Sequence, residues 1–266
     1  AWDFFVQNFK FCKIKAIWSI YFSIMKKISE KVFVGVVSNV VIFVMLVALV
    51  FSGVLANKKS LVLAGNREYR GTIYAGDKSS KKISLMINVY WGTEYVVQML
   101  DILKQNSIKT TFFVGGTWVE ENPEILIRMK DDGHEIGSHG YNHKEHGKLS
   151  DNQNHKEIKM CHDIVKLKAN ISMELFAPPG GSYNKNTTDA AFDLGYKTIM
   201  WTRDTIDWRD HDTNLIFSRA TSSMNGGDLI LMHPTKNTVE ALQKIIDFAK
   251  QKGLEPSTVS QTLGLV

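Results

Sequence analysis

The chain has 266 residues, of which 44% are apolar and 22% charged, a composition typical of a folded globular protein and unlike that of a disordered or collagen-like chain. The net charge of +5 comes almost entirely from residues 1–31, which hold six lysines against two acidic residues, whereas residues 57–266 hold 26 basic and 25 acidic residues. A nucleic-acid binder would carry its basic patch on the folded body, so these counts argue against nucleic acid as a partner. The two cysteines, Cys12 and Cys161, lie on opposite sides of an uncharged stretch and offer neither a disulfide framework nor a cysteine zinc site.

Residues 32–56 form that uncharged stretch of 25 positions, long enough for a helix to cross the roughly 30 Å hydrocarbon core of a membrane. Because lysines precede it, we expect a transmembrane signal anchor with residues 1–31 as a cytoplasmic basic flank and the C-terminal body outside the cell. A cleaved signal peptide, giving a secreted protein, is the alternative, since Val54-Leu55-Ala56 would suit a signal peptidase. Met25, which is followed by two lysines, is expected to be the start of synthesis.

Residues 57–80 are polar and mixed in charge, which predicts a spacer, and residues 81–266 then alternate between strand and helix patterns. Strands are predicted at 83–90, 110–114, 134–137, 174–177, 197–202 and 228–232, and helices at 94–106, 121–132, 151–169, 186–195, 212–224 and 237–252. This alternation predicts an α/β fold in which parallel strands, joined by crossover helices, form a sheet or a barrel. Such folds place their functional groups at the carboxyl ends of the strands.

Two chemically distinctive motifs follow the third and fourth predicted strands. His139 and His143 are four residues apart and could face one cation, although such a pair is by itself more often exposed and unligated. Further on, Pro178-Pro179-Gly180-Gly181 combines a fixed backbone with a free N–H group at Gly180 that could bind an oxyanion. Taken alone, this second motif is more simply a rigid turn.

Two more motifs follow the fifth and sixth predicted strands. Asp204, Asp207 and Trp208 would suit a sugar-sized groove beside a histidine, although helix capping is the plainer interpretation of the carboxylates. His233 leaves the last strand and could act as a general acid, a position in which a histidine is more often structural. Because every motif follows a predicted strand, we expect all four to converge at one rim.

The order and spacing of these motifs resemble the polysaccharide deacetylase family, the NodB-homology domain of carbohydrate esterase family 4. The resemblance covers about residues 82–264 and rests on the segments GHEIGSHGYNH, FAPPGGSYN, DTIDW and LILMHP. The segment INVYWGTEY is most similar to the sporulation-type, membrane-anchored branch of that family. The resemblance implies a distorted (β/α) barrel, here preceded by one transmembrane helix. It also implies hydrolysis of an acetamido C–N bond in N-acetylated cell-wall glycan, either peptidoglycan or spore cortex, with release of acetate.

The resemblance also implies roles for individual residues. His139 and His143 would hold a zinc-like divalent metal, and His233 would protonate the departing amine. Asp204 and Asp207 would adjust the charge of the ionisable groups with which they pair in the site. The substrate would contact Gly180 at its oxyanion, Trp208 along the groove and Leu231 in the acetyl pocket.

The sequence departs from the family at three positions. Asn88 stands in place of the aspartate base, Val89 or Tyr90 in place of the third metal ligand, and Ala177 in place of the arginine that pairs with the base. An amide cannot take a proton from water at neutral pH, and losing a general base lowers the rate by about 10²–10⁴. Two protein ligands are one fewer than a catalytic zinc site normally has, so the metal would be weakly held. Loss of the arginine is consistent with loss of the base, because an arginine without the base would be a buried cation without a partner. Glu94 is the nearest carboxylate in sequence that could replace the base.

Three functions therefore compete. The first is an extracytoplasmic, metal-dependent N-deacetylase of cell-wall glycan, and the second is a glycan-binding pseudoenzyme with the same fold. The third is a purely structural membrane protein without glycan affinity. The first two share N-acetylated glycan as a partner, and all three share the membrane, through residues 32–56.

Overall fold

The computed structural model describes residues 18–27, 38–39, 42–47 and 70–266. The chain divides into two units, residues 1–67 and 68–266. In the first unit, residues 18–27 and 42–47 are helical. None of the described helices is both long enough and apolar enough to cross a membrane. Most of the predicted anchor, residues 32–56, lies outside the described residues, so the anchor stays a prediction.

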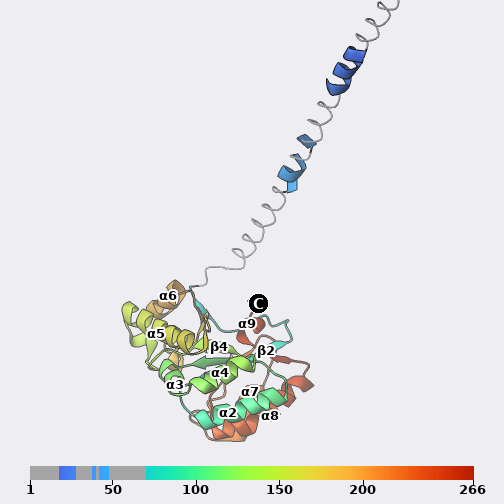
Figure 1. The fold of residues 1–266 in the computed structure, drawn as a ribbon. Helices are drawn as coiled ribbons and strands as arrows, with labels where there is room; N and C mark the ends of the chain where they lie inside the picture. The colour runs from blue at the N-terminus through green and yellow to red at the C-terminus, as the bar shows by residue number, and fades with distance from the viewer. Residues whose placement is uncertain (1–17, 28–37, 40–41, 48–69) are drawn as a thin grey trace, which may run out of the picture. The chain divides into compact units, whose positions relative to one another are not determined.

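The second unit is built around a curled, all-parallel sheet with helices packed on its outer face (Figure 1). The strand order is β1-β6-β5-β4-β3-β2-β8-β7, and β9 also pairs with β2. Among the described strands, the two at the ends of this order do not pair, so the sheet is an open half-barrel of the predicted α/β class. The strands are β1 (Thr72–Ile73), β2 (Lys82–Val89), β3 (Thr111–Val114), β4 (Glu135–Ser138), β5 (Leu175–Phe176), β6 (Lys197–Ile199), β7 (Arg203–Asp204), β8 (Leu229–Met232) and β9 (Glu255–Ser257).

Crossover helices connect the strands, as the alternating pattern predicts. They are α2 (Thr93–Gln105), α3 (Gly116–Glu121), α4 (Pro123–Asp131), α5 (Asp151–Ala169), α6 (Lys185–Asp193), α7 (Thr213–Thr221), α8 (Lys236–Gln251) and α9 (Val259–Thr262). Two short 3₁₀ turns, η1 (His146–Lys148) and η2 (Pro179–Gly181), lie in the loops after β4 and β5.

Three segments differ from the sequence-based expectation. The helix expected at 121–132 is α4, and an additional short helix, α3, precedes it and ends before Pro123, which lacks an N–H group to continue α3 and instead occupies the first turn of α4. The strand expected at 197–202 ends at Ile199 as β6, and a separate strand outside that range, β7, pairs with β8. Within the predicted spacer, Thr72 and Ile73 form β1 and pair with β6.

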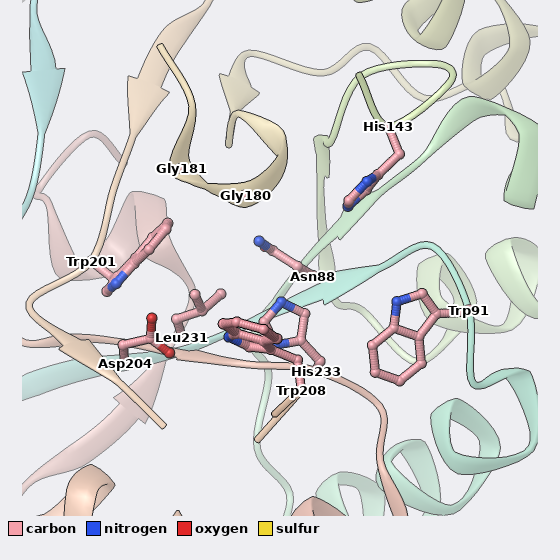
Figure 2. Close-up of a pocket in the computed structure, with 10 residues that line it drawn as sticks. All are labelled: Asn88, Trp91, His143, Gly180, Gly181, Trp201, Asp204, Trp208, Leu231 and His233. Atoms are coloured by element: carbon pink, nitrogen blue, oxygen red, sulfur yellow. The ribbon is translucent and has the colours of Figure 1, made fainter. Parts of the chain in front are cut away.

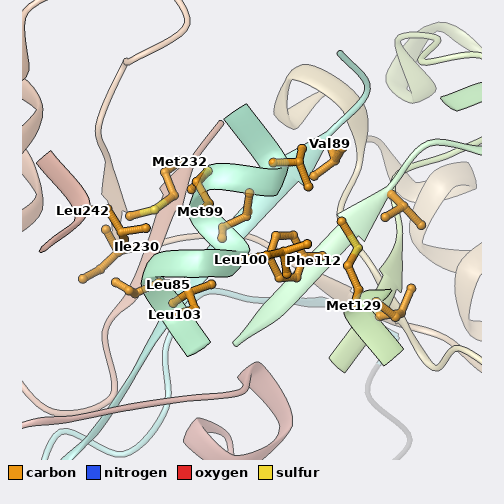
Figure 3. Close-up of a cluster of buried hydrophobic side chains, with 14 of the residues drawn as sticks. Leu85, Val89, Met99, Leu100, Leu103, Phe112, Met129, Ile230, Met232 and Leu242 are labelled. Carbon is orange, nitrogen blue, oxygen red and sulfur yellow. The ribbon is translucent and has the colours of Figure 1, made fainter. Parts of the chain in front are cut away.

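Side chains alternate along the strands and form two separate cores. In β2, Leu85, Ile87 and Val89 point outward into the large core beneath the helices (Figure 3). Met86 belongs to the smaller core inside the curl, and Asn88 follows it on that inner face. The members of the inner core are Met86, Phe113, Leu175, Ala177, Ile199, Leu229, Leu231 and Val259. Asn88 is therefore a polar side chain at the open end of an apolar interior.

Candidate glycan-binding site

A cavity of about 570 Å³ opens at the carboxyl ends of the strands (Figure 2). This volume lies within the range of about 300–1,000 Å³ that is typical of small-molecule sites. The lining residues are Asn88, Trp91, His143, Gly180, Gly181, Trp201, Asp204, Trp208, Leu231 and His233. The structure thus brings together all four motifs that follow predicted strands. Two of the predicted site residues, His139 and Asp207, are buried and do not line the cavity.

Asp207 fixes the position of His233. Its Oδ1 lies 2.8 Å from Nδ1 of His233, and its Oδ2 accepts the backbone N–H of His233 at 2.6 Å and the hydroxyl of Thr238 at 2.6 Å. Because Nδ1 donates to the buried carboxylate, Nε2 is the nitrogen left available to a ligand. The indole of Trp91 stacks on the imidazole, with ring centroids 6.1 Å apart and an angle of 9° between the planes.

Asp204 holds the turn that leads to Asp207 and Trp208. Its Oδ1 accepts the backbone N–H of Ile206 at 2.8 Å. Ile206 has a φ of 52°, a left-handed conformation that is rare for a β-branched residue. The hydrogen bond from Asp204 helps to hold this strained backbone at the edge of the cavity.

Asn88 provides the polar group on the β2 side of the cavity. It is only 3% exposed, and its Oδ1 has no hydrogen-bond partner among the described residues. Its side-chain nitrogen points toward the cavity in Figure 2. A buried acceptor left unpaired costs about 1–3 kcal/mol of stability. Ala177, which stands where the family has an arginine, is fully buried in the inner core.

Two neutral histidines lie next to each other beside Asn88. The ring centroids of His139 and His143 are 5.1 Å apart, with 68° between the planes. Nδ1 of His139 lies 2.7 Å from the carbonyl oxygen of Ala177, which leaves Nε2 for another partner. Burial, and then the charge of His143, holds the pKa of His139 well below its usual range, and burial also lowers the pKa of His143.

The residues around this pair do not complete a catalytic metal site. Val89 is fully buried in the outer core, so its position faces away from the histidines. The ring of Tyr90 packs 4.7 Å from that of His143, and its hydroxyl accepts a hydrogen bond from Thr117 at 2.9 Å. Within the part of the chain that the structure describes, no three His, Cys, Asp or Glu side chains are grouped to hold a metal. Two imidazoles without a carboxylate do not fit a zinc centre, which normally has three protein ligands.

The loop that bears His143 is anchored by Glu157, which the sequence motifs do not reveal. Its buried carboxylate accepts the backbone N–H groups of Tyr141 at 3.2 Å and Asn142 at 2.8 Å, and pairs with Lys144 at 2.8 Å. Burial raises the pKa of Glu157, but its contacts with Lys144 and Asn142 outweigh burial and hold that pKa below its usual value. The sequence feature that could have identified Glu157 is an acidic residue on the apolar face of α5.

Two tryptophans of the cavity were also missed, and one carboxylate was misjudged. Trp91 follows the predicted strand 83–90, so its place could have marked it, whereas Trp201 falls within the predicted strand 197–202 and lies beyond the observed end of β6. Glu94, considered as a substitute base, is exposed on the first turn of α2 and does not line the cavity.

Known proteins identify the family. The family profile described as polysaccharide deacetylase matches residues 75–199. A peptidoglycan-N-acetylglucosamine deacetylase of Bacillus cereus is 34% identical over 179 residues, which cover 64% of this chain and 82% of the relative. The chain belongs to the polysaccharide deacetylase family.

Other similar family members include a pseudoenzyme. The uncharacterized protein YlxY of Bacillus subtilis is 37% identical over 191 residues, which cover 72% of this chain but only 60% of that longer protein. The crystal structure of a CE4 family pseudoenzyme from Bacillus anthracis matches with a TM-score of 0.71 and 34% identity, covering 73% of this chain and 69% of that one. A mutant of the same pseudoenzyme, described as having restored enzymatic activity, matches with a TM-score of 0.71 and 33% identity, covering 73% and 72% of the two chains.

Proposed function

We propose that this protein binds N-acetylated cell-wall glycan in the cavity without hydrolysing it. The observation that carries the proposal is Asn88, a buried, neutral amide with an unpartnered oxygen where a deacetylase of this family would need a base. An amide both donates and accepts hydrogen bonds but takes no proton from water. The side chain at the centre of the site is therefore suited to recognition rather than to hydrolysis.

The rest of the cavity suits a sugar that bears an acetamido group. Trp208 is 52% exposed and offers an indole face to a sugar ring, and Trp91 and Trp201 line the same space. Asn88 can donate from its side-chain nitrogen, which faces the cavity, to the acetamido carbonyl, and Leu231 supplies an apolar wall for the acetyl methyl. The relatives named as peptidoglycan deacetylases support peptidoglycan as the source of this sugar.

The bond between His233 and Asp207 favours a second candidate, the N-deacetylase. In that reaction His233 would donate a proton from Nε2 to the departing amine while Asp207 holds the ring. The attacking water would still need a base: Asn88 is an amide, Glu94 lies outside the cavity, and Asp204, the carboxylate among the lining residues, already accepts the backbone N–H of Ile206.

We also propose that the domain acts outside the cell membrane, held by an anchor at residues 32–56 or secreted if the anchor is cleaved. The uncharged run and the lysines before it support this location. Membership of the sporulation-type branch likewise stays a prediction from INVYWGTEY. Accessibility of the domain to added protease on intact cells would test the location.

The deciding experiment measures binding and hydrolysis in the same samples. The full chain, supplied with zinc or cobalt, is titrated with N-acetylglucosamine oligomers while tryptophan fluorescence and released acetate are recorded. We expect saturable binding with no acetate release above that of a His139→Ala control. A Trp208→Ala variant should bind about three- to tenfold more weakly, the effect of losing one aromatic contact of about 0.7–1.4 kcal/mol.

The alternative functions predict different results. Metal-dependent acetate release from N-acetylglucosamine oligomers or peptidoglycan, lost in His139→Ala, would establish the deacetylase. Absence of both binding and release from a folded protein would favour the structural membrane protein.

A further inference from the structure

Two exposed tyrosines from distant parts of the chain touch beside the cavity. Tyr74 is 44% exposed and Tyr183 is 37% exposed. Their hydroxyl oxygens are 2.6 Å apart although the residues are separated by 109 positions. The hydrogen bond restrains both rings, so two large aromatic surfaces are held in place while remaining open to solvent.

Tyr74 reaches the strand ends that form the cavity through β1. This strand pairs in parallel with β6, with Ile73 opposite Ile199, and the backbone N–H of Met200 donates to the carbonyl of Ile73 at 2.8 Å. Parallel strands end at the same edge of a sheet, so Tyr74 emerges next to the segment that carries Trp201. Trp201 is itself part of the cavity wall.

Tyr183 approaches from the loop after β5. It lies two residues beyond Gly181, which lines the cavity and has a φ of 64°. Gly181 is packed so closely against Trp201 that a Cβ on it would lie 2.8 Å from the edge of the indole. The loop is fixed to the one that bears His143, because Ser182 Oγ and the carbonyl of Ser182 both accept the backbone N–H of Gly147.

We propose that Tyr74 and Tyr183 form a second binding position for the same glycan chain, holding a sugar unit that extends past Trp201. The proposal rests on the proposed glycan binding and adds that the ligand is an oligomer rather than a single sugar. Tyrosine rings give a large contact area at a low entropy cost, and their hydroxyls can bond to sugar hydroxyls. Because the hydrogen bond between them already restrains the two rings, ligand binding costs little additional side-chain conformational entropy.

A chain-length series tests this proposal. The affinity of the full chain is measured for N-acetylglucosamine oligomers of two to six units. We expect the wild-type affinity to rise at least about tenfold over the series, and we expect Tyr74→Ala and Tyr183→Ala each to remove most of that gain while leaving affinity for the dimer unchanged. Leu167→Ala, which alters a side chain 78% exposed on α5, is the matched control and should behave as wild type.

A second measurement needs no variant. Nitration of exposed tyrosines in the wild-type protein should be slowed at Tyr74 and Tyr183 by the hexamer and not by the dimer. Dimer binding without any gain for longer oligomers, or nitration that the hexamer leaves unchanged, would overturn the second position while the proposed function stands. Failure of every oligomer to bind would overturn both.

Discussion

The two sides of the cavity differ in charge. On the side of β7 and β8, a buried carboxylate, Asp207, is bonded to His233. On the side of β2 and β5 stand Asn88 and Ala177, which the sequence resemblance assigns to the family's base and arginine positions, and both residues are uncharged. Asp207 also binds the backbone of His233 and the hydroxyl of Thr238, so it fastens the end of β8 to the start of α8. A pair that looks catalytic can therefore persist for a structural reason, and its presence is not by itself a sign of catalysis.

Restoring charge to the neutral side should produce the largest effect. Asn88→Asp would place a carboxylate beside the two imidazoles, and with zinc or cobalt present we expect the double variant Asn88→Asp/Ala177→Arg to release acetate from N-acetylglucosamine oligomers about 10²–10⁴ times faster than the parent, the usual contribution of a general base. Asn88→Asp alone should lose several kcal/mol in its free energy of unfolding, because a buried carboxylate without a partner is costly. Acetate assays and denaturant unfolding of both variants check these expectations.

The control for this experiment is the same double variant carrying His139→Ala, which should be inactive. Val89 is left unchanged, because an aspartate there would enter the apolar outer core and is expected to unfold the protein. A parent protein that releases acetate as fast as the double variant would show that the neutral side does not limit the reaction.

Removing the charge from the other side should lower stability. Asp207→Ala leaves the backbone N–H of His233 and the hydroxyl of Thr238 without their acceptor, and we expect a loss of about 3 kcal/mol in the free energy of unfolding. Asp204→Ala is the matched control: this carboxylate is partly exposed and accepts one backbone N–H, so its loss should be about 1 kcal/mol. Equal losses in the two variants, measured by denaturant unfolding, would contradict a structural role specific to Asp207.

The sequence was sufficient to predict the rim of the site but not the bonds within it. The motifs after four predicted strands indicated which side chains would meet, because parallel strands end together. The choice between Val89 and Tyr90 stayed open, since it depends on where the chain leaves the sheet. The structure places Val89 in the outer core and Tyr90 against His143. The hydrogen bond that the backbone N–H of Ile206 donates to Asp204 depends on a strained turn, and no sequence pattern predicts that strain.

Acid should lower the stability of the domain through its buried histidines, including one that lies away from the cavity. His134, at the start of β4, is 7% exposed, and burial lowers its pKa from 6.5 to about 4. Between these two pH values the unfolded chain binds a proton that the folded protein does not, so stability falls as the pH falls. We expect a loss of about 2–3 kcal/mol from His134 between pH 7 and pH 4, measured by denaturant unfolding.

His134→Gln is the control for this pH dependence. Its side-chain oxygen can still accept the backbone N–H of Thr110, which His134 binds at 3.2 Å, but it cannot be protonated in this range. The variant should therefore lose less stability than wild type on acidification. The same slope in both proteins would assign the acid sensitivity to other groups, such as His139.

The smallest expected effect separates a structural role for Asn88 from a role in binding. Asn88→Leu keeps a similar volume and removes a buried acceptor that has no partner, so the free protein should be unchanged or more stable by about 1 kcal/mol. If Asn88 pairs with the acetamido group, the same variant should bind N-acetylglucosamine oligomers at least about tenfold more weakly, the value of a hydrogen-bonded contact of about 1.4 kcal/mol. Unfolding and oligomer titrations on one preparation measure both. A loss of stability with unchanged affinity would make Asn88 a packing residue, and the neutral side of the cavity would then lack its proposed recognition group.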